Sequence, residues 1–242
     1  MGNEVKLVLK DSQIHTAIAA LDLFFRIYLG QYDAIDMLYL WSWDTDLYYD
    51  HNVDEARDVL MVPIRNALMP DMMSSGFGGS RGIYNKLNPP DCMDAYNLMC
   101  SIRSAYAWYR DPICTFATVD YRPPTKKGRY CPATCVIEKK EEAAVANLTM
   151  CKEQYELLLT AARVYLDVLT GMLRDAFGVF TQDPELLALA EEAEQYHPEH
   201  LNKRTLSNAE NLLQLLRITA GLNAAQEGRG RNGADTTPRR NR

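Results

Sequence analysis

The stretch Ser12–Tyr32, SQIHTAIAALDLFFRIYLGQY, decides the fold that we expect for this chain. Apolar side chains recur in it at steps of three and four, and the pattern continues beyond it: Ile14, Ile18, Leu21, Phe25, Tyr28, Tyr32, Ile35 and Tyr39. This spacing is typical of an amphipathic α-helix that buries one face. It predicts a helix over Ser12–Leu40, which would have about seven turns.

The same pattern returns 141 positions further along the chain, at Tyr155, Leu159, Ala162, Leu166, Leu169, Leu173, Ala176 and Phe180. The match pairs Gly30 with Gly171, and a second match, at an offset of 114, pairs Asn97–Arg103 with Asn211–Arg217. Glycine inside a helix costs about 1 kcal/mol relative to alanine. Its repeated use indicates a shared purpose, which we expect to be close backbone approach at a helix crossing. We therefore interpret the chain as a degenerate duplication.

The fold class that we expect is mainly α, with two degenerate repeated helical units and a short β-hairpin between them. The divisions are an N-terminal helical unit over 1–110, a hairpin connector over 111–147, a C-terminal helical unit over 148–224 and a disordered basic tail over 225–242. The hairpin is predicted from strand-like runs at 113–121 and 129–138. Further helices are expected over 53–69, 89–109, 150–180, 184–196 and 206–222. The first and fourth helices should pack together, because neither unit alone can bury so long an apolar stripe.

Composition excludes some classes of protein and disfavours others. The 242 residues carry a net charge of −6, and five arginines in the last 16 residues leave the rest of the chain more acidic still. An acidic body argues against broad nucleic-acid binding, although local basic spots can act. No apolar run reaches the roughly 18 residues that span a bilayer, and the start lacks a signal-peptide pattern. We expect a cytoplasmic protein with no membrane partner.

The six cysteines are expected to be thiols rather than disulfides or metal ligands. Cys131 and Cys135 form a C-x3-C pair, with Cys114 as a possible third ligand, but no nearby histidine or fourth cysteine completes a tetrahedral zinc site. We predict neither a metal nor a cofactor.

Several short motifs of the N-terminal unit occur together: Leu7-x-Leu9, Gln13, the run Ala20–Ile27, Gly30–Tyr32 and Gly82–Asn85. In this combination the unit resembles a family of small phage-encoded proteins. The resemblance covers about the first 110 residues. It implies a phage origin and action in the cytoplasm of a bacterial host, but it carries over no activity.

The segment Ser74–Tyr84, SSGFGGSRGIY, is the nearest approach to a ligand motif. It fits neither the phosphate loop of nucleotide-binding enzymes nor the dinucleotide pattern. Exposed amides and one arginine can still form an anion nest, so the candidate ligand-binding residues include Gly78, Gly79, Ser80 and Arg81. Trp41 and Trp43 are candidates for stacking on a planar ligand. The alternatives are a mobile surface connector for the loop and coverage of the core for the tryptophans.

Secondary anion-contact candidates lie at the predicted hairpin tip: Arg122, Lys126, Lys127 and Arg129. A solubilising loop is the alternative interpretation. For catalysis, no nucleophile elbow is present, and Asp44, Asp46 and His51 form either an acid–base cluster or a solvated surface. We name no catalytic residue.

These observations favour a non-catalytic phage accessory binding protein that acts in the bacterial host, with counter-defence as a possible purpose. Its partner would be a small anionic, nucleotide-like ligand that it sequesters, or a host protein, and an oligomer is possible. The alternatives are an enzyme acting on a nucleotide or phosphorylated substrate, and a DNA-associated accessory protein that uses the hairpin and the tail.

Overall fold

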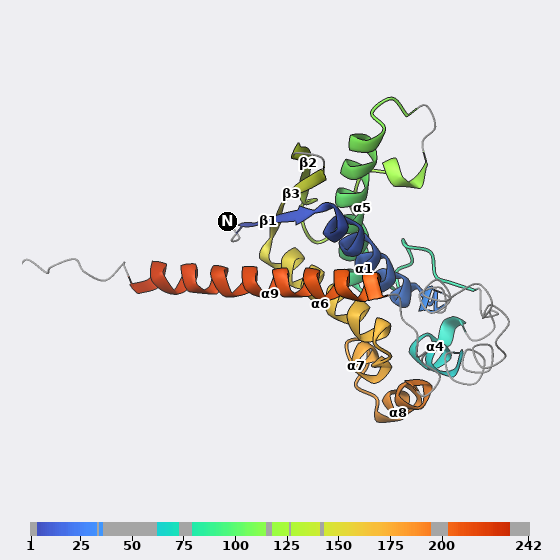
Figure 1. Cartoon of the computed structure of the whole chain (residues 1–242). Coiled ribbons are helices and arrows are strands. Elements are labelled where there is room, and N and C mark those ends of the chain that lie inside the picture. The colour runs from blue at the N-terminus through green and yellow to red at the C-terminus, as the bar shows by residue number, and fades with distance from the viewer. Residues whose placement is uncertain are drawn as a thin grey trace, which may run out of the picture.

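The computed structural model describes residues 4–32, 34–35, 62–72, 79–114, 118–125, 127–140, 143–194 and 203–232. This part of the chain is mainly helical, as predicted, with a small antiparallel sheet (Figure 1). The helices are α1 (Asp11–Leu29), α4 (Val62–Leu68), α5 (Pro90–Arg110), α6 (Lys152–Leu169), α7 (Leu173–Phe177), α8 (Pro184–Ala193) and α9 (Lys203–Asn232). Two short 3-10 helices, η3 (Pro70–Met72) and η4 (Val119–Tyr121), lie between them.

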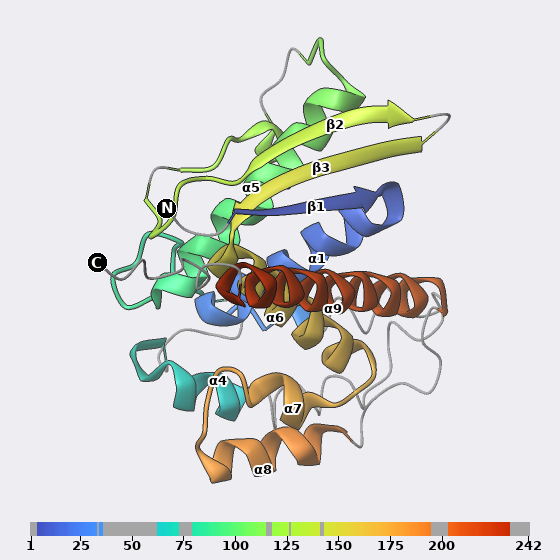
Figure 2. The ribbon, with the colours of Figure 1, turned by 90° about the vertical axis from the view of Figure 1, so that its left-hand side faces the viewer.

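The sheet joins the two halves of the chain. Its strands are β1 (Glu4–Lys10), β2 (Thr134–Lys140) and β3 (Ala143–Cys151), in the order β1-β3-β2. Figure 2 shows the three strands side by side, and α1 and α5 pack on one face of the sheet. Alternate residues of β1 and β3 are buried on that face: Val5, Leu7, Leu9, Ala144, Ala146, Leu148 and Met150. This period of two is what a half-buried sheet requires.

Helices α1 and α6 begin and end in the same way. Each follows a strand directly, and a glutamine at the third helical position, Gln13 or Gln154, accepts a hydrogen bond from the backbone N–H of the residue before the helix. Each helix ends at a glycine with φ of 76°, Gly30 and Gly171. At both ends the glycine N–H and the next N–H bond back to the carbonyls three and five residues earlier, which is a Schellman cap.

The two matched helices also pack against each other in the core, which confirms that part of the prediction. Helix α5 packs mainly on α1, and α9 packs on both α1 and α6. Aromatic rings join the halves, because Phe24 and Tyr28 of α1 contact Phe180, and Tyr32 contacts Phe177. Figure 1 shows that the later part of α9 runs out beyond the body.

Two predicted helices are too long. The first was expected to reach Leu40 and the fourth Phe180, but the left-handed glycines end α1 at Leu29 and α6 at Leu169. An amphipathic pattern that continues past such a cap belongs to a second, short helix, as α7 shows. The predicted use of Gly30 and Gly171 inside a helix is therefore wrong, because both are helix ends.

The hairpin lies later in the chain than predicted. Residues 113–121 were expected to be its first strand, but their described part is coil and η4, and the two hairpin strands are β2 and β3. The tail prediction also differs, since α9 continues to Asn232 instead of ending near 222. Of the helix expected at 53–69, the structure describes residues 62–69, and 62–68 of them form α4.

None of the helices in the described ranges is both long and apolar enough to cross a membrane.

The register of strands β1 and β3 bears on the predicted duplication. Leu7 pairs with Leu148, its own counterpart at the offset of 141, and the pairs on either side are symmetric about it. This register, like the matched caps, supports the duplication, which remains a prediction.

Candidate ligand-binding site

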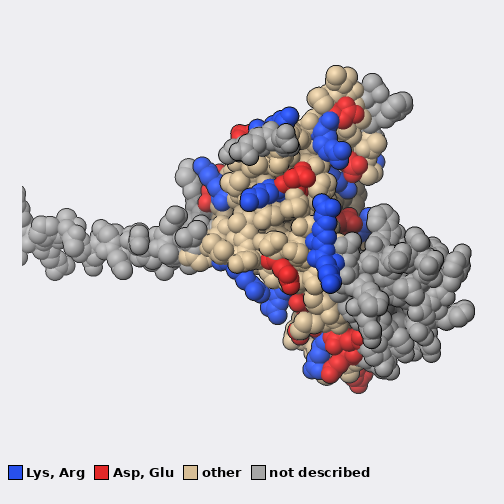
Figure 3. Space-filling model, in the orientation of Figure 1, with Lys and Arg blue, Asp and Glu red and all other residues tan. Residues whose placement is uncertain are grey.

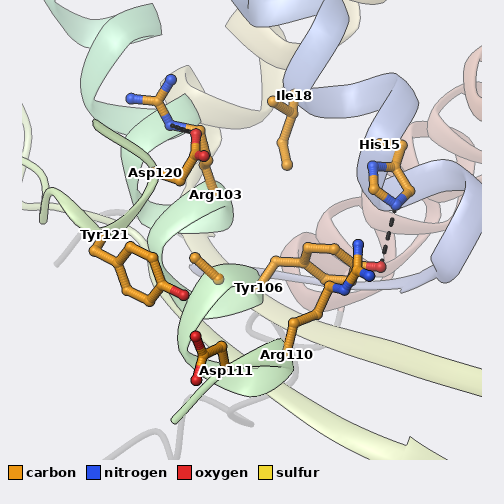
Figure 4. Close-up of a pocket in the computed structure, with 9 residues that line it drawn as sticks. His15, Ile18, Arg103, Tyr106, Arg110, Asp111, Asp120 and Tyr121 are labelled. Atoms are coloured by element: carbon orange, nitrogen blue, oxygen red, sulfur yellow. Dashed lines mark hydrogen bonds and ion pairs between the residues drawn. The ribbon is translucent and has the colours of Figure 1, made fainter. Parts of the chain in front are cut away.

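A cleft of about 520 Å³ opens between α1, the C-terminal half of α5 and the segment that follows α5 (Figure 4). This volume lies within the roughly 300–1,000 Å³ of sites that hold small molecules. Its lining combines aromatic rings, both signs of charge and two small or apolar side chains: His15, Ile18, Arg103, Tyr106, Ala107, Arg110, Asp111, Asp120 and Tyr121. We refer to these nine residues as the α1–α5 cleft.

Helical spacing brings the α5 residues of the cleft to one face. Arg103, Tyr106 and Arg110 follow one another at steps of three and four, the neighbour spacing of a helix surface. His15 and Ile18, three apart on α1, face them across the cleft (Figure 4). The site therefore depends on how α1 packs against α5, and not on any one loop.

A hydrogen-bonded chain runs along one wall of the cleft. The Tyr106 hydroxyl donates to the Asp11 carboxylate at 2.8 Å, and His15 Nε2 lies 3.1 Å from the same hydroxyl oxygen. Because the phenol has one proton and a carboxylate only accepts, Nε2 of His15 must carry the proton of the second bond. Burial, and then the bond to Asp11, raise the pKa of Tyr106, so this residue stays neutral.

The opposite wall carries the carboxylates of Asp111 and Asp120, and Arg103 fixes its position. The Arg103 guanidinium donates to the Val119 carbonyl at 3.1 Å, and its Nε lies 3.8 Å from the Asp120 carboxylate. These contacts fix η4 against α5. A hydrogen bond with Cys114, then burial, then the carboxylates of Asp111 and Asp120 raise the pKa of Tyr121 to about 12. Tyr121 therefore presents a neutral hydroxyl and a ring that also contacts Trp108.

Arg110 is the cation of the cleft that remains available. It is exposed and forms no ion pair with any residue that the structure describes. In Figure 4 its side chain reaches along Tyr106 towards His15. Since Arg103 already donates a hydrogen bond to Val119 and forms an ion pair with Asp120, Arg110 is the residue best placed to meet an added anion.

Two of the glycine-loop residues that the sequence favoured, Ser80 and Arg81, form hydrogen bonds within the protein. Arg81 is buried and donates to both carboxylate oxygens of Asp71, with Arg81 Nε 3.0 Å from one of them. Its backbone N–H bonds to the Leu29 carbonyl at 2.8 Å, and Ser80 accepts from Gln31 at 3.1 Å. Gly79 lies in coil next to them. Ligand contact here remains a prediction, and for Arg81 it would require the ion pair to open.

The remaining candidates have separate surroundings. Arg129 forms ion pairs with Asp91 and Asp94, and the Lys127 ammonium lies 4.5 Å from the centre of the Tyr84 ring. Arg122 is exposed. The other predicted site residues lie outside the described residues: Trp41, Trp43, Gly78, Lys126, Asp44, Asp46 and His51.

Sequence reasoning did not single out Tyr106 or Arg110. The sequence does contain one signal for them. The first half of α5 is buried, whereas Arg103, Tyr106 and Arg110 follow at steps of three and four and place polar groups on one face of its second half. In the described ranges no group of three or more His, Cys, Asp or Glu is arranged to hold a metal ion.

Comparisons of the chain with family models, with curated proteins and with solved structures found no match. The function must therefore be inferred from the cleft itself.

Proposed function

We propose that the protein is a binding protein that sequesters a small anionic ligand with a planar ring, of nucleotide type, in the α1–α5 cleft. The observation that carries this proposal is Arg110, an arginine without an ion-pair partner among the described residues, beside the ring of Tyr106. A guanidinium binds phosphate through charge-assisted hydrogen bonds. An aromatic ring stacks on a base, which contributes about 1–3 kcal/mol per base.

A comparison within the chain supports a specific use of the cleft. At the two offsets, His15 corresponds to Glu156 and Tyr106 corresponds to Ala220. Both offsets match buried apolar positions, such as Ala20 with Ala161 at the offset of 141 and Leu98 with Leu212 at the offset of 114. The residues that would contact a ligand therefore differ between the units while the core positions match, as expected if one unit alone acquired the site.

The biological setting rests on the resemblance of the N-terminal unit to small phage-encoded proteins. In that setting the protein is a phage accessory factor that acts in the bacterial cytoplasm, and removal of a nucleotide-like signal would serve counter-defence. A host protein as the target is the outcome to consider if no small ligand binds.

One observation favours an enzyme as the second candidate. The hydrogen bonds from Tyr106 to Asp11 and from His15 to Tyr106 orient the histidine at the edge of the cleft. Such a histidine can move a proton to or from a phosphorylated substrate. Chromatography of nucleotides after incubation with the protein separates the two candidates, because sequestration returns the ligand unchanged.

The DNA-associated alternative has less support. Arg129 is already paired with two aspartates. On the face in Figure 3 the basic and acidic side chains are interspersed instead of forming one broad basic patch. A non-specific nucleic-acid surface would need such a patch.

The proposal is tested by calorimetric titration of the protein with nucleoside monophosphates and inorganic pyrophosphate. We expect Arg110→Ala to weaken nucleotide binding at least tenfold without changing the melting temperature, because Arg110 is exposed. Arg217→Ala, which removes an exposed arginine of α9 that does not line the cleft, is the matched control and should bind as the parent does. Equal binding by Arg110→Ala and the parent would contradict the proposal.

A further inference from the structure

The α1–α5 cleft has two walls of opposite character, and this polarity restricts the ligand further. His15 and Arg110 line the wall around Tyr106, whereas Asp111 and Asp120 lie around Tyr121 (Figure 4). From this polarity we infer that the cleft binds a guanine-type nucleotide. The hydrogen-bond donors of the base would contact the Asp111 carboxylate, and the phosphate would contact the Arg110 guanidinium. The inference rests on the proposed function and names its ligand class.

Asp111 is the carboxylate that is free to accept from a ligand. Asp120 lies 3.8 Å from Arg103 Nε and helps to fix η4. Asp111 forms no ion pair with the described residues, and Ile113 N–H occupies only its Oδ1 oxygen, at 3.2 Å. It directly follows the last turn of α5, so its position relative to Arg110 is set by the helix end. In Figure 4 its carboxylate lies near the Tyr121 hydroxyl, on the side of the cleft away from His15.

The chemistry of the base edges makes this arrangement selective. An ionised carboxylate only accepts hydrogen bonds. Guanine offers two donors on one edge, its N1–H and its exocyclic amino group, and both can meet one carboxylate. Adenine presents an acceptor, its unprotonated N1, at the corresponding position. A site that hydrogen-bonds a donor discriminates strongly against an analogue that lacks it, because the site's polar group is then left unpaired.

The rest of the cleft suits the other parts of such a ligand. Tyr106 and Tyr121 supply aromatic rings, and Tyr121 also forms an edge-on contact with Trp108, with 4.9 Å between the ring centres. Arg110 is the last residue of α5 and Asp111 follows it directly, so one helix end would contact both the phosphate and the base. The volume of about 520 Å³ accommodates a ligand of this size.

The test is calorimetric titration of the full chain with guanosine, adenosine and xanthosine 5′-monophosphates and with ribose 5-phosphate. The parent should bind the guanosine nucleotide at least tenfold more tightly than the adenosine nucleotide. Asp111→Asn should remove this preference and improve binding of the xanthosine nucleotide, which has a carbonyl where guanine has its amino group and so meets the amide donor of asparagine. Asp175→Asn, an exposed change on α7, is the control and should behave as the parent does.

The outcomes separate this inference from the proposed function. Equal affinity for the guanosine and adenosine nucleotides would overturn recognition of the base and leave anion binding in place. Equal affinity for ribose 5-phosphate and the guanosine nucleotide would have the same meaning. A parent that binds none of the four compounds would overturn the proposed function itself. The gain of xanthosine nucleotide binding in Asp111→Asn is a positive signal that a misfolded variant cannot give.

Discussion

Single residues decide where the elements of this protein end and which charges are available to a ligand. Gly30 is the clearest case. Its φ of 76° is a conformation that other residues adopt only at a cost, and a Cβ at this position would lie 2.7 Å from the sulfur of Met69. Glycine is therefore required twice at this helix end, once by the backbone and once by the packing.

We expect Gly30→Ala to lower the free energy of unfolding by about 1–2 kcal/mol, the cost of a left-handed alanine. Gly82→Ala is the matched control, because a Cβ there meets nothing within 4 Å. Urea unfolding of both variants measures the difference. If Gly30→Ala and Gly82→Ala unfold alike, the left-handed cap does not limit stability.

Arg81 and Asp71 give a prediction about pH. The hydrogen bond from Arg81 lowers the pKa of Asp71 below its ordinary value. A lowered pKa in the folded state means that the pair stabilises the protein above the unfolded pKa of about 4, and that this stabilisation is lost as the pH falls through the folded pKa. We expect Asp71→Asn to melt below the parent near neutral pH, and the gap to narrow below about pH 4.

Melting curves of both proteins between about pH 3 and pH 7 test this expectation. Arg81→Ala should also melt below the parent, because it leaves Asp71 without its partner. A variant that melts like the parent would show that Arg81 is free for another use.

At the scale of elements, the core depends on contacts between α1 and the region around α7. Phe177 is 1% exposed and packs on Tyr32 beyond the end of α1. We expect Phe177→Ala to cost about 3–5 kcal/mol, the usual penalty for removing a buried aromatic ring. Val179→Ala, a change at an exposed position two residues later, should cost little. Denaturant unfolding of the two variants compares them, and equal midpoints would contradict this packing.

The helices could be predicted from the sequence because their apolar spacing is local. The prediction of 89–109 nearly matches α5, and that of 184–196 contains α8. The ends of α1 and α6 could not be placed, since the apolar pattern runs on past the glycines. Strand β1 was missed because its pairing with β3 lies far along the chain, and seven residues leading directly into a helix give little signal of their own.

The cleft could be predicted only in part. His15, Arg103 and Tyr106 each stand on a predicted helix, but no feature of the sequence indicates that α1 and α5 turn these faces towards each other. The glycine loop drew attention by its composition, whereas the described structure shows Arg81 bonded to Asp71. The Trp41–Tyr49 segment lies outside the described residues.

At the scale of the whole molecule, the two halves of the chain are interdependent. Strand β1 of the first half pairs with β3 of the second, and α1 packs on α6. We expect a fragment of residues 1–130 to lack a cooperative thermal transition, because its strand and its apolar helix face would have no partner. Circular dichroism on heating measures this. A sharp transition of the fragment alone would show that the first unit folds independently.

The most direct test of the central claim is a titration of ¹⁵N-labelled protein with guanosine 5′-monophosphate, followed by amide chemical shifts. If the α1–α5 cleft is the binding site, the largest changes will fall on His15, Tyr106, Arg110, Asp111 and Tyr121. Amides at Gly79–Arg81 and on α9 will move little. Changes centred on Gly79–Arg81 with none at the end of α5, or no changes at all, would contradict the claim.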